Sequence, residues 1–139
     1  ELQERVFGAI PNTKRYIDHL KGISRQVGMV VTINGRVLPI PFGEWEGKRS
    51  RQNHKAPNYT ISGSALDQFV DTLIEIDRQG LSSGFYQGMH DEFVVSADIA
   101  HDVQKIMERP PGGLIRMARR TPKIRTDIEI LGERWVKPE

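Results

Sequence analysis

An Asn-Gly pair at positions 34 and 35 constrains the fold of this chain more than any other short segment. It separates two runs that are rich in β-branched residues, 29–33 and 36–40. Asn and Gly both tolerate the positive φ angles of a tight turn, so the pattern predicts a β-hairpin over 29–40. A second hairpin is expected over 85–95, with His90-Asp91 at its tight connection.

Helical periodicity occupies other parts of the chain. Pro11-Asn12-Thr13 is a helix-start signal, and Gly28 ends the segment that follows. A long apolar repeat and a Ser96 cap predict two further helices. The long repeat runs through Ile61, Ala65, Phe69, Leu73 and Ile76, broadened by Leu66, Val70 and Ile74.

The expected fold class is therefore α+β, with an antiparallel β-hairpin sheet built at Asp91 and helices packed against it. The chain is taken as one domain, 1–139. Its expected elements are helices at 11–27, 58–79 and 97–109, hairpins at 29–40 and 85–95, a mobile basic loop at 42–53 and a last strand at 126–131.

Composition excludes several classes of protein. The chain has no cysteine, so disulfides and thiolate metal sites are ruled out. No apolar run approaches the roughly 18–20 residues needed to cross a bilayer, and the polar N-terminus is unlike a signal peptide. We expect a soluble, cytoplasmic protein with no membrane partner. The first residue is Glu rather than Met, so we expect an upstream part that this sequence does not include.

The net charge is only +2, but the basic residues are clustered. Two basic clusters on a nearly neutral chain suit a polyanionic partner, although they would equally describe two solvated loops. One cluster comprises Lys48, Arg49, Arg51, His54 and Lys55, and the other Arg116, Arg119, Arg120, Lys123 and Arg125.

Adjacent carboxylates, Asp91 and Glu92, occupy the connection of the second expected hairpin. A tight turn can present both to one point in space, and hard cations such as Mg²⁺ bind carboxylate oxygens. Phosphoryl transfer uses such cations to neutralise charge on the attacking and leaving oxygens. The plainer alternative is a solvated hairpin tip.

Asn58 and Ser62 lie four residues apart, so they share a helix face. Gly63 and Ala65 keep that part of the helix slim, and short polar side chains suit hydrogen bonds to base edges in a minor groove. Capping by Asn58 and close helix packing at Gly63 would also explain the pattern.

Taken together, these segments resemble the C-terminal palm portion of a family A, bacterial polymerase I-like DNA polymerase. Residues 87–92 are similar to the family's motif C, Gln-Val-His-Asp-Glu, and residues 58–67 to its Asn-x-x-x-Gln-Gly-Thr-Ala-Ala-Asp motif. Residues 28–36 are similar to its Gly-Tyr-Val-x-Thr-x-x-Gly-Arg-Arg hairpin, and residues 132–135 to its Gly-Glu-x-Trp ending. All of these segments occur in the family's order.

The resemblance implies roles for individual residues. Asp91 corresponds to the motif C aspartate that binds the catalytic Mg²⁺ ions, and Glu92 to an auxiliary acid beside them. Two residues correspond to DNA-contacting positions: His90 near the primer terminus and Asn58 in the minor groove. Two others stand at such positions with a changed residue: Ser62 in place of the family's Gln and His54 in place of Arg. Arg51 would compensate for the change at 54.

The implied function is template-directed DNA synthesis in DNA replication or repair, a nucleotidyltransferase reaction at a primer 3′-hydroxyl by a two-metal mechanism. Its partners would be primer–template DNA and a dNTP. The family's second metal-binding aspartate and its nucleotide-binding helix are not found in this sequence. The isolated chain is therefore expected to be inactive, and to need the missing N-terminal part or a second polypeptide.

Alternatives remain open. A single-subunit RNA polymerase shares the palm, but usually has Ser where this chain has Glu92. A non-catalytic nucleic-acid-binding module would use only the basic clusters. An inactive fragment would have no role of its own.

Overall fold

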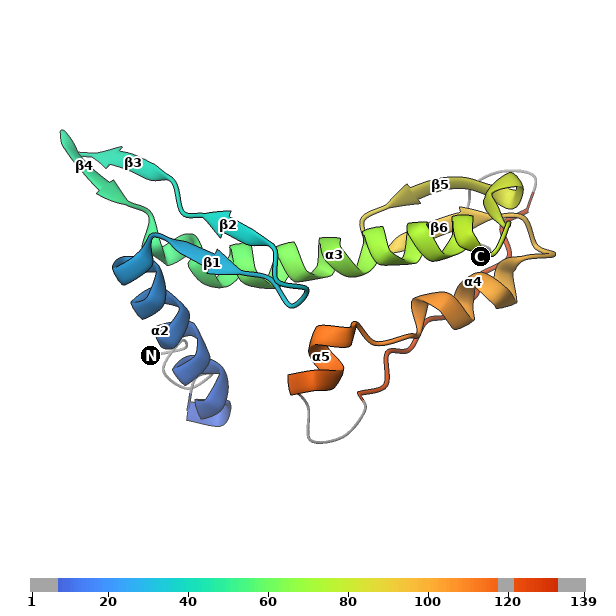
Figure 1. Cartoon of the computed structure of the whole chain (residues 1–139), viewed down its shortest axis with the longest axis horizontal. Coiled ribbons are helices and arrows are strands. Elements are labelled where there is room, and N and C mark those ends of the chain that lie inside the picture. The colour runs from blue at the N-terminus through green and yellow to red at the C-terminus, as the bar shows by residue number, and fades with distance from the viewer. Residues whose placement is uncertain (1–7, 118–121, 133–139) are drawn as a thin grey trace. The chain divides into compact units, whose positions relative to one another are not determined.

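The computed structural model describes residues 8–117 and 122–132 of the chain. Those residues form helices and three separate two-stranded antiparallel sheets, in the order shown in Figure 1. The fold is thus α+β, as expected, but the strands are paired locally instead of forming one sheet. The chain divides into two compact units, 1–67 and 68–139, and each is described separately below.

The first unit opens with helix α2, Pro11–Val27, over the expected range. Its proline stands in the first turn, where a missing N–H costs nothing. Gly28 ends the helix in the left-handed conformation, with its N–H donated to the carbonyl of Ser24. The helix buries Leu20 and Ser24, and Leu20 joins a small apolar core with Val30, Ile40 and Ala56.

The first hairpin pairs β1, Met29–Val31, with β2, Val37–Pro39. The connection is longer than a two-residue Asn-Gly turn. Thr32 and Arg36 close it through backbone and side-chain hydrogen bonds, and of the Asn-Gly pair Gly35 alone has a positive φ, at 90°. The hairpin was therefore located correctly, but its strands are shorter than the β-branched runs.

The stretch 42–53 is not the mobile loop that its polar composition suggested. It forms a second hairpin of β3, Phe42–Trp45, and β4, Lys48–Arg51, followed by the short helix η1, Asn53–Lys55. Its turn residues Glu46 and Gly47 have φ angles of 51° and 72°. Positive φ at both central residues matches the twist of a two-residue hairpin, which explains why so polar a segment pairs.

Helix α3, Ala56–Arg78, begins and ends slightly before the expected 58–79. Within the first unit its buried face is small and polar: Ala56, Thr60, Gly63 and Asp67. The expected apolar stripe is wrong there, because Ile61 and Leu66 are more than half exposed. A slim face lets the β1–β2 hairpin approach closely, and Ser64 accepts a hydrogen bond of 2.9 Å from the Ile33 N–H.

The second unit contains the rest of α3, the short helix η2, Ser82–Gly84, and strands β5, Phe85–Met89, and β6, Glu92–Val95. Helices α4, Ala100–Met107, and α5, Gly112–Met117, follow. Its core consists of Ile76, Val103 and Ile106, on which side chains from the β5–β6 hairpin pack. The expected packing of two helices on this hairpin is thereby confirmed.

Two expectations for the second unit are wrong. The helix expected at 97–109 starts at Ala100, and Ser96 does not cap it; the Ser96 N–H instead bonds the Gly84 carbonyl. Residues 126–131 form no strand. Of these residues, Thr126 has its backbone groups bonded to helix-side residues: Glu108 accepts from its N–H and Gln104 donates to its carbonyl.

No helix in the described ranges, 8–117 and 122–132, is long and apolar enough to span a membrane. Of the segments singled out in the sequence, Glu133–Trp135 and Arg119–Arg120 lie outside the described residues.

Candidate functional site

The β5–β6 hairpin presents the two carboxylates singled out in the sequence. Met89 and Glu92 form its last cross-strand pair, so His90 and Asp91 are the connection, as expected. His90 adopts a φ of 55°, which is uncommon for a residue with a side chain. His90, Asp91 and Glu92 are all exposed. The hairpin end therefore displays an imidazole and two carboxylates to solvent.

Aromatic packing anchors this hairpin within its unit. The Phe93 ring on β6 stacks on Phe69 of α3, with centroids 4.8 Å apart, and meets Phe85 edge-on at 5.6 Å. Gly88 lies against the same rings, and a Cβ there would come within 2.6 Å of Phe69. Such pairs contribute about 0.5–1.5 kcal/mol beyond the area they bury, so the hairpin is held where Asp91 and Glu92 begin their exposed turn.

The carboxylates fit part of a magnesium site. Asp91 and Glu92 offer the hard oxygen donors that Mg²⁺ prefers, and their exposure leaves room for its water ligands. Within residues 8–117 and 122–132, however, no three His, Cys, Asp or Glu side chains gather into a metal-binding group. The described residues offer two neighbouring carboxylates, and a complete coordination shell would need further ligands.

A second set of candidates lies in the first unit, at the start of α3. Asn58 and Ser62 are exposed on one helix face, as their spacing predicted, and the Ser62 hydroxyl donates to Asn58 Oδ1 over 3.2 Å. This bond occupies the amide oxygen of Asn58 and leaves its N–H₂ group directed to other acceptors. Their role in a minor groove stays a prediction.

His54 and Arg51 flank that helix start and differ in what they contact. His54 lies exposed in η1. Arg51, in contrast, donates from Nη1 to the carbonyls of Gly28, at 2.9 Å, and Ile40, at 3.2 Å. Its guanidinium also lies over the Phe42 ring. Arg51 thus ties together α2, β2 and β4, and its contact with DNA stays a prediction.

An ion pair in the first unit was not foreseen from the sequence. Arg36 donates from Nε to Asp67 Oδ1 over 2.7 Å, and its Nη2 donates to the Gly63 carbonyl over 2.9 Å. Asp67 is only 8% exposed, and its Oδ2 is buried without a hydrogen-bond partner. Asp67 is the last residue of the segment 58–67 that resembles a polymerase motif. Its place there was the sequence signal that could have indicated a structural role for Asp67.

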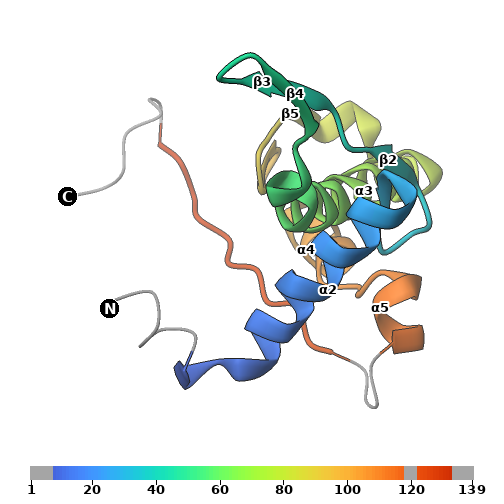
Figure 2. The same cartoon turned by 90° about the vertical axis from the view of Figure 1, so that its left-hand side faces the viewer.

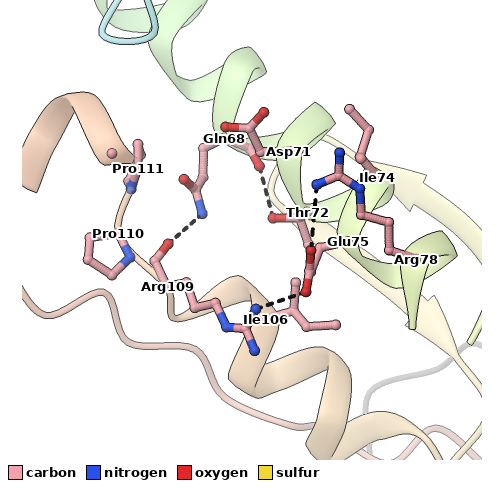
Figure 3. Close-up of a pocket in the computed structure, with 11 residues that line it drawn as sticks. Gln68, Asp71, Thr72, Ile74, Glu75, Arg78, Ile106, Arg109, Pro110 and Pro111 are labelled. Atoms are coloured by element: carbon pink, nitrogen blue, oxygen red, sulfur yellow. Dashed lines mark hydrogen bonds and ion pairs between the residues drawn. The ribbon is translucent and has the colours of Figure 1, made fainter.

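The second unit also has a pocket of about 370 Å³ that sequence reasoning missed (Figure 3). Glu75 lies in its wall and accepts a hydrogen bond of 3.0 Å from Arg109, while Gln68 donates to the Arg109 carbonyl over 2.9 Å. The pKa of Glu75 is lowered most by the hydrogen bond from the Gln79 amide and next by the hydrogen bond from the Arg109 guanidinium. These contacts join α3 to the end of α4, so the polar lining serves internal packing.

Comparison with known proteins gives the sequence resemblance independent support. The chain is 29% identical over 102 residues to DNA polymerase I of Chloroflexus aurantiacus, covering 70% of this chain and 11% of that protein. This chain is thus similar in sequence to a bacterial DNA polymerase I. The polymerase-like region is also 29% identical over 103 residues to DNA polymerase I of Bacillus caldotenax and 27% identical over 115 residues to that of Deinococcus radiodurans.

These alignments cover 70% and 76% of the polymerase-like chain, and 12% of each relative. The chain thus spans about one eighth or less of the length of the curated relatives it matches. No family model and no solved structure matches it.

Proposed function

We propose that this chain supplies the motif C part of the palm of a template-directed DNA polymerase, in which a nucleotide is transferred to a primer 3′-hydroxyl. One observation carries the proposal. In a chain similar to DNA polymerase I, Asp91 and Glu92 are exposed together at the end of a hairpin anchored by the Phe69–Phe93 stack. Adjacent carboxylates held on a rigid support suit the binding of hard cations.

Asp91 and Glu92 would hold Mg²⁺, with two ions shared between them and an aspartate from outside this chain. Bound there, Mg²⁺ neutralises charge on the oxygens of the transferring phosphoryl group. Asp91 and Glu92 themselves contribute negative charge at a fixed position, because their backbone is set by the β5–β6 pairing. His90, next to them, would lie beside the primer terminus.

The primer–template would be contacted by residues of the first unit. Asn58 offers its amide N–H₂ to acceptors in a minor groove, since Ser62 occupies its oxygen. All four bases carry acceptors on that edge, so this contact would position the duplex without reading its sequence. His54 and Arg51 would add contacts to the DNA backbone, and the incoming dNTP would be held by residues outside this chain.

The test is nucleotide incorporation by the polymerase assembled with the polypeptide that supplies the second aspartate. Asp91→Asn is expected to abolish incorporation, whereas binding of primer–template, measured by fluorescence anisotropy, stays within about twofold. Asp98→Asn is the matched control, because it removes the same charge from an exposed loop of the same unit. Incorporation by the Asp91→Asn assembly at the rate of the Asp98→Asn control would rule out the proposal.

A second candidate function is that of a non-catalytic nucleic-acid-binding module. The observation that favours it is the cluster of basic residues on the folded β3–β4 hairpin. Under that function, Asp91→Asn changes nothing, and removal of Arg49 and Lys55 weakens nucleic-acid binding and flattens its salt dependence.

A further inference from the structure

The β3–β4 hairpin extends away from the other elements of the first unit, and both views show it standing clear of α2 and of β1–β2 (Figures 1 and 2). Strand residues alternate between its faces. Phe42 pairs with Arg51 and Glu44 with Arg49, so these side chains share one face. Phe42 is 51% exposed.

The two arginines on this face are both held over the phenylalanine ring. The guanidinium carbon of Arg51 lies 4.5 Å from the ring centroid of Phe42, and that of Arg49 lies 5.3 Å away. Arg51 is also anchored by the carbonyls of Gly28 and Ile40, so it fixes the ring in place. Phe42, Arg49 and Arg51 therefore form one cluster of an aromatic ring and two guanidinium groups, called here the Phe42–Arg49 platform.

The positive charge of this hairpin is available to a ligand. Lys48 and Arg49 are exposed, and within the described part of the chain neither has a carboxylate at ion-pair distance. By contrast, Lys14, Lys105 and Arg109 are each held by an acidic side chain. An anion that approached Lys48 and Arg49 would not have to displace an existing ion pair.

We propose that the β3–β4 hairpin is a binding site for single-stranded nucleic acid. Arg49 contacts a phosphate on the face that carries Phe42, Lys48 contacts another phosphate beside the turn from the opposite face, and an unpaired base stacks on the Phe42–Arg49 platform. Unpaired bases expose the π faces that such a platform needs, whereas in a duplex those faces are covered by neighbouring base pairs. The site goes beyond the proposed polymerase function, because it requires neither Asp91 nor a metal ion.

The test is fluorescence anisotropy of a labelled 12-nucleotide oligothymidine and of a duplex of the same length, titrated with the 139-residue chain in the absence of Mg²⁺. The single strand is expected to bind more tightly than the duplex. Phe42→Leu keeps an apolar side chain but removes the ring, and it should weaken single-strand binding about 5- to 10-fold without changing the salt slope. Phe42→Trp should retain the affinity.

The charge variants separate phosphate contact from stacking. Lys48→Gln and Arg49→Gln should each reduce the slope of log affinity against log salt concentration by about 0.7. Arg49→Lys should keep that slope but bind less tightly, since it retains the charge and loses the planar group. Lys105→Gln is the matched control and should bind like the parent chain, because Lys105 is already paired with Asp102.

Several outcomes would overturn this site. One is duplex binding that equals or exceeds single-strand binding. Another is displacement of the labelled strand by polyglutamate as effective as that by unlabelled oligothymidine. The third is unchanged affinity in both Phe42→Leu and Arg49→Gln. Circular dichroism checks that each variant is folded; if Phe42→Leu is not, Phe42→Trp and the Arg49 pair decide the result. Failure here leaves the polymerase proposal intact, because the Asp91→Asn assay measures incorporation and not strand binding by the isolated chain.

Discussion

Arg36 and Asp67 form the one ion pair among the described residues that includes a buried side chain, Asp67, and its geometry is uneven. Two nitrogens of Arg36 approach the same oxygen, Asp67 Oδ1, at 2.7 Å, while Oδ2 has no partner. Burying a carboxylate is unfavourable unless a cation and hydrogen bonds compensate. The pair therefore holds the β1–β2 hairpin against α3 only as long as both members are present.

Removing the cation alone should be the most damaging change at this pair. Arg36→Met leaves the Asp67 carboxylate buried without compensation and should lower the free energy of unfolding by about 2 kcal/mol, less than for a fully buried pair because Arg36 is 42% exposed. Urea unfolding of Arg36→Met, Asp67→Asn and the double variant measures the coupling. Strictly additive effects would contradict an energetic link between the two side chains.

Glu75 allows a test of electrostatics at single-residue level. The Gln79 amide and then the Arg109 guanidinium lower the pKa of Glu75 below its ordinary 4.5, since both stabilise the carboxylate. Because the folded-state pKa is depressed, the stabilisation is present above the ordinary value and is lost as pH falls through the lowered pKa. Gln79→Leu and Arg109→Gln should each raise this pKa.

Carbon-detected NMR titration of the Glu75 carboxyl group provides the measurement. Asp102 serves as the internal reference: Lys105 lowers its pKa first through a hydrogen bond and then through its charge, and neither variant touches that pair. An unchanged Glu75 pKa in both variants would show that neither the Gln79 amide nor the Arg109 guanidinium lowers it.

At the scale of elements, helix α3 illustrates what its sequence could and could not reveal. Its existence and length followed from the apolar repeat, but the face buried in the first unit did not. Ala56, Thr60 and Gly63 are buried because a slim surface admits the β1–β2 hairpin, whereas Ile61 remains 59% exposed. Hydrophobic periodicity predicts where a helix lies, but it does not predict a buried face that is made of small residues.

The β3–β4 hairpin was missed for a related physical reason. A polar stretch gives no alternation of apolar and polar residues, and its strands are set by the turn at Glu46-Gly47 and by Arg51 on the carbonyls of Gly28 and Ile40. Contacts between segments that are distant in the sequence, such as these, cannot be predicted from the local sequence. The β5–β6 hairpin was predictable because apolar strands flank its turn.

A glycine pair tests the close approach of hairpin and helix. At Gly63 a Cβ would lie 2.6 Å from Leu38 Cδ1 and 2.9 Å from Thr32 Cγ2, whereas at Gly22 of α2 nothing lies within 4 Å. Gly22→Ala should stabilise the chain by about 0.5–1 kcal/mol through helix propensity. Gly63→Ala should instead destabilise it by about 1–2 kcal/mol, because overpacking outweighs the same gain.

Thermal unfolding followed by circular dichroism compares the two variants directly. Equal stabilisation by Gly63→Ala and Gly22→Ala would show that the hairpin yields to an added methyl group without cost.

At the scale of the whole molecule, the chain has two small cores, each made within its own unit. Ile76, Val103 and Ile106 form one, and Leu20, Val30, Ile40 and Ala56 form the other. Neither core is large, so removal of a single buried side chain should be felt mainly by the unit that contains it.

Ile76→Ala should destabilise the second unit by about 2–4 kcal/mol, whereas Ile76→Val should cost about 1 kcal/mol. Hydrogen exchange with mass-spectrometric detection should show faster exchange over 85–107 and unchanged exchange over 20–40. Ile40→Ala is the reciprocal control and should give the opposite pattern. Uniform acceleration along the chain in both variants would mean that the two cores unfold as one cooperative body.

Gly28 and Arg51, far apart in sequence, limit the order in which this molecule can change during evolution. Gly28 has a φ of 75°, and a Cβ there would overlap the Arg51 guanidinium. A larger residue at 28 would be strained at this φ and would displace the Arg51 guanidinium, and shortening Arg51 would remove the donors from the carbonyls of Gly28 and Ile40. The two positions are therefore epistatic, and each single step away from them passes through a less stable intermediate.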